Sequence, residues 1–259
     1  MGIINVTPDS FYDGGNTTVT TEILFQANKM IEQGATFLDI GGYSSRPGGD
    51  DVSEEVEINR VIPAIEALLK EYPETLISVD TFRSQVAQLA VEAGAVMIND
   101  ISGGQLDDKM FKTVAKLKVP YVLMHMRGTP KTMQNETDYD HLMKDILSYF
   151  AERSKMAIDA GINDLILDPG FGFSKTISQN FELLDKLENF KSMNFPFLVG
   201  ISRKSMIYKT LESKPEEALN GTTALHAISL LKGASILRVH DVKEAVECVT
   251  LLENLKSDS

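Results

Sequence analysis

The chain has 259 residues, 43% hydrophobic and 24% charged, so it can bury a large core, and its formal net charge of −12 argues against nucleic acids and anionic membranes as partners. The single cysteine, Cys248, excludes an internal disulfide and is interpreted as a core residue, because it lies in an apolar helix-like pattern. No apolar run reaches the roughly 18 residues of a membrane span and the start does not resemble a signal peptide, so we expect a soluble cytoplasmic protein.

Short apolar runs alternate with amphipathic stretches along the whole chain. In chain order, the predicted strand regions and the helices after them in the first half are Gly2–Asn5 with Thr20–Gln33, Gln33–Ile40 with Ser53–Glu71, Leu76–Asp80 with Ser84–Ala93, and Ala93–Asp100 with Lys109–Leu117. Those in the second half are Val119–His125 with Tyr139–Ala160, Ala160–Asp168 with Gln179–Asn189, Phe197–Ser202 with Pro215–Lys232, and Lys232–His240 with Val242–Leu255. Ser53 and Asp241 are predicted helix N-caps. The strands are nearly continuously apolar, as expected for parallel strands buried on both faces.

One phrase occurs four times and indicates repeated units. Its glycines, each followed by a short apolar run that stops at a polar residue, are Gly34, Gly94, Gly161 and Gly233. Glycine readily takes the left-handed conformation that ends a helix. Eight strand–helix units without a Ser/Pro-rich linker predict an α/β fold, a single (β/α)₈ TIM-barrel domain over residues 1–259. An open doubly wound sheet is the alternative.

The polar residues at the strand ends are the candidate site. In chain order they are Asn5, Asp39, Asp80, Asn99 with Asp100, His125, Asp168, Ser202, and Arg238 with His240. In a barrel, the carboxyl ends of all strands meet on one face, where active sites lie. A simpler interpretation is that polar residues only mark where strands reach water, but that does not explain why acids and amides gather at some ends and cations at others.

The chemistry of these strand ends divides into two groups. Asp80, Asn99 and Asp168 suit a flat heterocycle that presents several N–H donors. Lys204, Arg238 and His240 follow the last two strands, where barrels often bind phosphate, so they indicate an anionic group in the substrate. The alternatives are a solvated lysine and an arginine that only forms salt bridges.

Two loops rich in glycine and polar residues follow strands on the same face. They span Thr7–Gly15 and Gly41–Gly49, and such loops can close over a substrate and exclude water. We expect Arg46 to reach an anion, although both segments could be ordinary connections. His226 is interpreted as a packing or surface residue, and His125 is as compatible with a structural role as with ligand contact. No zinc-like spacing or nucleotide-binding glycine motif occurs.

The order of the motifs is similar to that in dihydropteroate synthases. The matching segments are Asn5–Phe11, Asp39–Gly42, Ser45–Gly48, Ser78–Thr81, Asn99–Gly104, Met124–Met126, Asp168–Phe173, Ser202–Ser205 and Arg238–Val242. They extend over almost the whole chain. Tyr43 departs from the pattern, since the family often has an acid there. Family members also usually carry residues before the first motif, which form part of the first strand and the barrel floor.

The resemblance implies a role for each matching residue. The pterin would be held by Asp80, Asn99, Asp168, Lys204 and Arg238. The diphosphate would be held by Asn5, Ser45, Arg46, Arg238 and His240, and the 4-aminobenzoate by Pro47, Phe173, Ser202 and Lys204. Asn5 would also bind Mg²⁺, and Arg238, Lys204 and Asp80 would serve catalysis.

The same resemblance implies a reaction in folate biosynthesis. A homodimeric enzyme, of a kind targeted by sulfonamides, would join 6-hydroxymethyl-7,8-dihydropterin diphosphate to 4-aminobenzoate by dissociative substitution at the pterin methylene carbon, releasing pyrophosphate. Two alternatives remain. A pterin-dependent methyltransferase shares the barrel and the acids but needs no cluster of cations for a diphosphate. An inactive pterin-binding relative would bind without turnover.

Overall fold

A computed structural model of the chain describes residues 1–6, 16–43 and 52–255. Its parallel strands form a sheet of six in chain order and a separate pair. The sheet consists of β1 (Gly2–Asn5), β2 (Phe37–Gly41), β3 (Leu76–Asp80), β4 (Met97–Asp100), β5 (Tyr121–Met124) and β6 (Leu165–Asp168), and the pair consists of β7 (Leu198–Val199) and β8 (Ile236–Leu237).

Two parallel bridges join the sheet and the pair into a closed barrel. Leu167 of β6 pairs with Phe197 next to β7, and Gly2 of β1 pairs with Val239 next to β8. At the second junction the carbonyl oxygen of Val239 accepts from Ile3 N at 3.0 Å, and Val239 N donates to Met1 O at 2.9 Å. The predicted (β/α)₈ barrel is therefore confirmed, and the open sheet is excluded.

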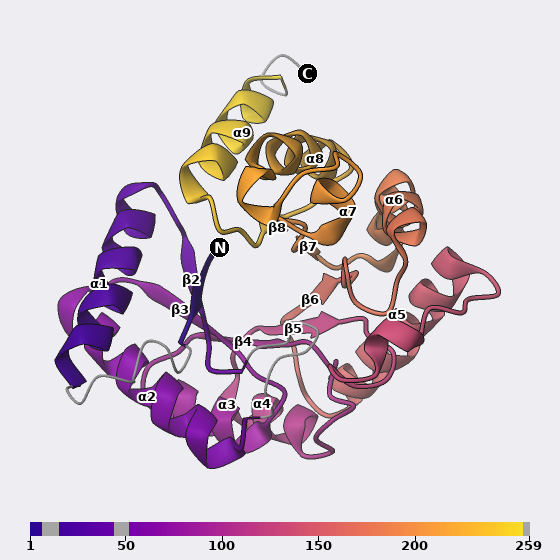
Figure 1. Cartoon of the computed structure of the whole chain (residues 1–259). Helices are drawn as coiled ribbons and strands as arrows, with labels where there is room; N and C mark the ends of the chain where they lie inside the picture. Colours follow the sequence, from indigo (N-terminus) through magenta and orange to yellow (C-terminus); the bar gives the residue numbers. More distant parts are fainter. Residues whose placement is uncertain (7–15, 44–51, 256–259) are drawn as a thin grey trace.

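The helices lie around the outside of the strands (Figure 1). They are α1 (Asn16–Glu32), α2 (Glu54–Glu71), α3 (Ser84–Glu92), α4 (Met110–Leu117), α5 (Leu142–Asp159), α6 (Ile177–Asp185), α7 (Ser205–Tyr208), α8 (Leu219–Leu231) and α9 (Val242–Asn254), with short 3₁₀ helices at Met133–Asn135, Leu187–Met193 and Pro215–Glu217. Among the described residues, no helix combines the length and apolar character of a membrane span. Cys248 of α9 is buried, as predicted.

The four repeated glycines end helices in the predicted way. Their φ angles are +93°, +112°, +101° and +107° at Gly34, Gly94, Gly161 and Gly233. After each glycine, the next backbone N–H donates to a carbonyl five residues back, which closes the helix end; the pairs are Ala35 with Met30, Ala95 with Ala90, Ile162 with Ala157, and Ala234 with Ser229. The chain is thereby turned from each helix directly into the next strand.

Two predictions about helix ends can be compared with the structure, and one short helix was missed. Ser53 caps α2, because its hydroxyl accepts from Val56 N at 3.3 Å. Asp241 occupies the predicted N-cap position of α9, but its carboxylate makes no capping bond and pairs with Arg203 instead. The one-turn helix α7 was not predicted, because four residues are too few to show a helical period.

Strand parity separates the outer core from the barrel interior. Leu38, Ile98 and Leu167 belong to the large cluster beneath the helices. On the other face of the strands, the barrel floor is apolar and consists of Met97, Val122, Ile166 and Leu198, with Met1, Phe37 and Ile236 against them. Asn99, Asp168 and Arg238 lie two positions after Met97, Ile166 and Ile236. Residues two positions apart on a strand point to the same face, so these polar side chains form a layer directly above the apolar floor.

Candidate active site

Arg238 is the centre of the polar layer above the floor. Its Nε donates to Asp39 Oδ2 at 2.6 Å, and its Nη2 donates to Asp80 Oδ2 at 2.7 Å. Burial alone would lower the pKa of Arg238, but the two carboxylates outweigh it and raise the pKa above its ordinary value. The guanidinium therefore stays charged and links β8 to β2 and β3 across the mouth of the barrel.

Two acceptor oxygens beside this arginine have no donor. Asn99 Nδ2 donates to Asp39 Oδ2 at 3.0 Å, which fixes both side chains. Asp39 Oδ1 and Asn99 Oδ1 are buried and have no hydrogen-bond partner among the described residues. The same is true of the Ser78 hydroxyl. Buried acceptors are normally paired, so this part of the mouth is suited to a ligand that donates several N–H groups.

The other two predicted acids lie in the same layer. Burial raises the pKa of Asp80, and Asp39 raises it further, while Arg238 opposes the rise. Burial also raises the pKa of Asp168, against the opposing charge of Lys204. The backbone N–H of Gly170 donates to Asp168 Oδ1 at 2.8 Å, which fixes the carboxylate at the end of β6.

Lys204 and Phe173 are brought together from separate loops. The ammonium of Lys204 lies 4.5 Å from the centre of the Phe173 ring and donates to the carbonyl oxygen of Phe171. Burial lowers the pKa of Lys204 to about 8, although Asp168 opposes the change. An aromatic ring beside a cation suits an aromatic carboxylate, as the resemblance implies for these two residues.

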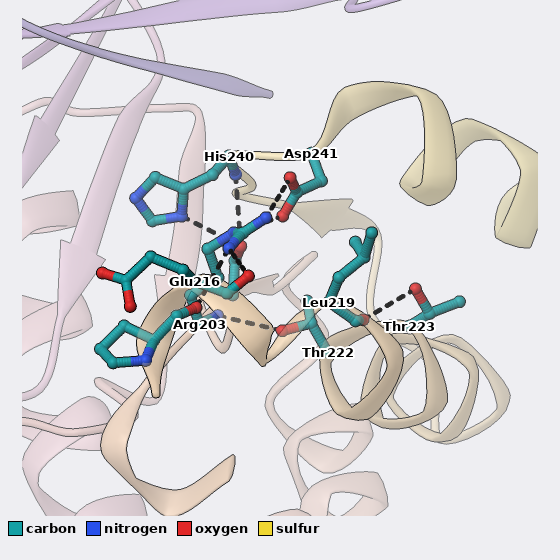
Figure 2. Close-up of polar contacts among 9 residues, drawn as sticks. Arg203, Glu216, Leu219, Thr222, Thr223, His240 and Asp241 are labelled. Atoms are coloured by element: carbon teal, nitrogen blue, oxygen red, sulfur yellow. Dashed lines mark hydrogen bonds and ion pairs between the residues drawn. The ribbon is translucent and has the colours of Figure 1, made fainter. Parts of the chain in front are cut away.

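Ser202 and His240 form a pair at the ends of β7 and β8. The Ser202 hydroxyl lies 3.0 Å from His240 Nδ1, and His240 N donates to the same hydroxyl at 3.2 Å. The neighbouring Arg203 forms two 2.8 Å bonds to Asp241 (Figure 2). Ser202 therefore lies against a residue predicted to bind diphosphate, as well as being a predicted aminobenzoate contact.

Asn5 is exposed at the end of β1, and its neighbourhood is compatible with a magnesium ion. A Cβ on Gly41 would stand 3.8 Å from both Asn5 Oδ1 and Asp80 Oδ2, so the missing side chain leaves space next to both oxygens, the second of which also accepts from Arg238. Magnesium prefers such hard oxygens and usually keeps one or two protein ligands beside substrate phosphates and water. The described residues contain no group of three acidic, histidine or cysteine side chains that would hold a metal without the substrate.

Several predicted contacts lie outside the described residues. They are Ser45, Arg46, Pro47 and the segment between Thr7 and Gly15. Tyr43, which replaces the frequent family acid, packs edge-on against Phe82 with ring centres 5.1 Å apart. Its ring also lies 5.5 Å from the guanidinium of Arg83, so the substitution puts an aromatic contact at this loop end.

Two buried residues of this region were not assigned a role from sequence. Asp39 was recognised only as a strand end, although its carboxylate ties Arg238 to Asn99. Lys175 was missed, because a lysine shortly after a glycine-rich turn looks like a solvated loop residue; it is only 6% exposed. The surroundings of His125 favour a structural role. The side chain is buried and its ring packs edge-on against that of Tyr149, with ring centres 4.8 Å apart.

A cavity of about 610 Å³ lies next to His125 but is separate from the predicted substrate contacts. Its lining includes Arg127 and Tyr149 together with the carboxylates of Glu136, Asp145 and Glu152. None of the residues predicted to hold pterin, diphosphate or aminobenzoate lines it. The candidate site is therefore assigned from the converging strand ends, where the charged groups and unpaired acceptors are.

Comparison with known proteins agrees with this arrangement. The sequence model of a family described as "Pterin binding enzyme" matches residues 1–240. Dihydropteroate synthase of Escherichia coli is 46% identical over 255 residues, which cover 98% of this chain and 90% of that protein. The Bacillus subtilis dihydropteroate synthase is 45% identical, with 98% and 87% covered.

Solved structures give the same result. A Yersinia pestis dihydropteroate synthase in complex with a sulfonamide drug superposes with a TM-score of 0.92 at 44% identity, covering 99% of this chain and 94% of that one. A Xanthomonas albilineans dihydropteroate synthase with 4-aminobenzoic acid gives a TM-score of 0.91 at 40% identity, covering 99% and 92%. With the barrel and its strand-end residues in place, these similarities show that the chain belongs to the dihydropteroate synthase family of pterin binding enzymes.

Proposed function

We propose that this protein is a dihydropteroate synthase. It joins 6-hydroxymethyl-7,8-dihydropterin diphosphate to 4-aminobenzoate and releases pyrophosphate and 7,8-dihydropteroate. The single observation that supports this most strongly is the pair of buried acceptors, Asp39 Oδ1 and Asn99 Oδ1, which have no partner among residues 1–6, 16–43 and 52–255 and lie beside the fixed cation Arg238. A substrate with an N–H-rich ring and an anionic tail satisfies both halves of this site.

Each group of residues then has one part in the reaction. Asp80, Asn99 and Asp168 hold and orient the ring, and the carboxylates of Asp80 and Asp168 favour the cation that develops on it. Arg238 and His240 are proposed to stabilise the negative charge that grows on the departing diphosphate. The C–O bond to the methylene carbon breaks with its electron pair going to pyrophosphate, and the amine then forms the C–N bond and loses a proton.

Lys204 and Phe173 are proposed to place the second substrate. The ammonium faces the ring of Phe173, so a flat benzoate can lie beside the aromatic side chain with its carboxylate toward positive charge. Ser45, Arg46 and Pro47 are proposed to complete the diphosphate and aminobenzoate contacts. A magnesium ion held by Asn5 and the diphosphate would neutralise charge on the leaving group.

A turnover assay with both substrates tests this function. We expect pyrophosphate and dihydropteroate to appear in equal amounts, only when both substrates are present, and removal of Mg²⁺ by a chelator to suppress both. Binding of the pterin diphosphate without release of pyrophosphate would contradict the proposal and indicate an inactive relative. Methyl transfer from methyltetrahydrofolate without pyrophosphate chemistry would indicate a methyltransferase.

We also propose that the enzyme is a homodimer and acts in the cytoplasm. Residues 1–259 of each chain are proposed to form a single barrel domain. Similarity to the family supports the dimer, and the single cysteine suits a reducing compartment. Sedimentation equilibrium at assay concentration should give twice the mass of one chain; a monomer of full activity would contradict the dimer.

A further inference from the structure

A buried lysine holds the turn that carries both halves of the substrate site. Lys175 Nζ donates to the carbonyl oxygens of Gly170 at 2.9 Å and Phe173 at 3.0 Å, and lies 3.1 Å from His125 Nδ1. An ammonium has three donors and no acceptor, so these three acceptors satisfy it completely. Two of them are main-chain atoms of the same turn, and the third is on His125, just after β5.

The contacts of Lys175 stabilise a turn in which several residues have positive φ angles. Gly170 and Gly172 have φ angles of +70° and +80°, and the non-glycine residue Ser174 has +51°. A Cβ on Gly170 would stand 2.1 Å from the carbonyl oxygen of His125, so the turn lies directly against the end of β5. A conformation of this kind persists only where surrounding contacts determine it.

The two carbonyl groups that accept from Lys175 belong to residues next to, or part of, the proposed substrate site. Gly170, whose carbonyl is bound by Lys175, donates its own N–H to Asp168 Oδ1. Phe173, whose carbonyl is also bound, presents its ring to Lys204. A shift of either carbonyl would therefore move an acid of the ring site or the aromatic wall of the amine site.

We propose that Lys175 is a positioning residue that sets the places of Asp168 and Phe173 through the main chain of this turn, with His125 as its fixed anchor. The proposal rests on the proposed function for its substrates. Lys175 touches neither substrate directly, and it acts on the two subsites together because one side chain binds both carbonyls.

The protonation of the pair is compatible with this role. Burial lowers the pKa of His125 well below its ordinary value, and Lys175 lowers it further, so the imidazole is neutral. A neutral ring with its proton on Nε2 offers Nδ1 as an acceptor to the amine. Burial lowers the pKa of Lys175 to about 7, against the opposing charge of Asp168, so the amine has donors for the carbonyls in either state.

Substitution of Lys175 by methionine tests the proposal in the full chain. Met keeps the length and apolar stem but removes all donors, so we expect the Kd for the pterin and the KM for 4-aminobenzoate to rise together by about tenfold. Tyr139→Phe is the matched control. It removes a 2.9 Å bond from the Tyr139 hydroxyl to the Ser174 carbonyl of the same turn, and should change each constant by less than about twofold.

Substitutions of His125 provide a second test that remains valid if Lys175→Met does not fold. His125→Asn keeps an acceptor oxygen near the Nδ1 position, and His125→Leu removes it. We expect the Asn variant to recover most of the affinity that the Leu variant loses for both substrates. A purely structural role would lower the melting temperature of these variants and leave Kd and KM at their wild-type values.

The outcomes separate this inference from the proposed function. Wild-type turnover with unchanged pterin Kd and aminobenzoate KM in Lys175→Met would overturn the positioning role alone. Equal constants in His125→Asn and His125→Leu would do the same. Failure of the wild-type enzyme to release pyrophosphate would overturn the proposed function, and calorimetric Kd values for the pterin would still decide whether Lys175 positions Asp168.

Discussion

At the scale of single residues, the site is a set of charges fixed before substrate arrives. Arg238 is held by two carboxylates, and Asp39 is held by Arg238 and Asn99. Groups fixed in this way do not need to reorganise as charge develops, which is the main source of electrostatic stabilisation in enzymes. The arginine was expected either to bind an anion or to form salt bridges, and its geometry permits both.

Removal of this arginine should damage stability and activity together. Arg238→Ala leaves the buried carboxylate of Asp39 and the half-buried carboxylate of Asp80 without their cation, so we expect the free energy of unfolding to fall by about 3 kcal/mol. Turnover should fall by about 100-fold or more, because the leaving group loses its fixed cation. Urea unfolding and pyrophosphate release measure the two effects.

The control for Arg238→Ala is an ion pair on the surface. Lys155 and Asp159 pair at 2.5 Å on α5, but their side chains are 74% and 62% exposed. Lys155→Ala should change the unfolding free energy by no more than about 0.5 kcal/mol and leave turnover unchanged. An Arg238→Ala enzyme as stable and active as this control would contradict the assigned place of Arg238.

Asp168→Asn tests the carboxylate at the end of β6. The amide keeps the shape and the bond from Gly170, but it cannot accept two parallel N–H bonds from a ring. We expect the Kd for the pterin to rise by about 100-fold, measured by calorimetry. Asp164→Asn, an exposed position before the same strand, should bind like the wild type; equal affinity in both variants would refute the role of Asp168.

At the scale of elements, the last two strand ends are joined by ion pairing rather than by long strands. Strands β7 and β8 have two residues each, and Arg203 just after β7 binds Asp241 just after β8 with two 2.8 Å bonds. Arg203 has a φ of +54° and also donates its backbone N–H to Thr222 of α8. This ion pair, drawn in Figure 2, joins the segments that carry Ser202 and His240, whose side chains lie 3.0 Å apart.

A double-mutant cycle on Arg203 and Asp241 should detect this ion pair. Each side chain is about a quarter or less exposed and the pair is bidentate, so we expect a coupling free energy of about 1–2 kcal/mol in urea unfolding. The Lys155–Asp159 cycle should give less than about 0.5 kcal/mol. Coupling of the same size in both cycles would show that the first pair has no special role.

Helix α8 contains a histidine that should make the protein sensitive to acid. His226 is 2% exposed, its Nε2 has no partner among the described residues, and burial lowers its pKa to about 4. The folded pKa lies below the unfolded value of about 6.5, so stability is lost as pH falls below about 6.5, and the loss levels off near pH 4. At pH 5 the loss from this group is roughly 2 kcal/mol.

His226→Leu should remove this part of the acid sensitivity. The difference in unfolding free energy between pH 7.5 and pH 5 should be smaller in the variant than in the wild type, measured by urea unfolding at both values. His141→Gln removes an exposed imidazole at the start of α5 and serves as the control. If His226→Leu lost as much unfolding free energy between pH 7.5 and pH 5 as the wild type does, the histidine would not be buried in its neutral form.

The sequence predicted the strand ends well because two strong regularities act there. The repeated glycine defines where four of the strands start, and strand parity then directs residues such as Asn99 and Asp168 to the interior. The sequence could not predict the contact of Lys175 with His125, since 50 positions separate them and neither follows a periodic pattern. Asp241 lies at the predicted N-cap position of α9 but makes no capping bond, because its carboxylate pairs with Arg203, which the sequence could not predict.

At the scale of the whole molecule, closure of the barrel brings the two chemistries together. The acids come mainly from β2 to β6, and Arg238 with His240 comes from β8 at the other end of the chain. The junction of β1 with β8 returns Arg238 to Asp39, 199 positions away. The formal net charge of −12 makes this local positive charge informative, because most of the chain would repel an anion.

A crystal structure of the protein grown with 6-hydroxymethyl-7,8-dihydropterin, pyrophosphate and Mg²⁺ is the most direct measurement. We expect the ring N–H groups to lie within hydrogen-bonding distance of Asp80, Asn99 and Asp168. Pyrophosphate should lie against Arg238 and His240 at the same mouth. A ring bound elsewhere, with pyrophosphate remote from Arg238, would contradict the assignment of the site.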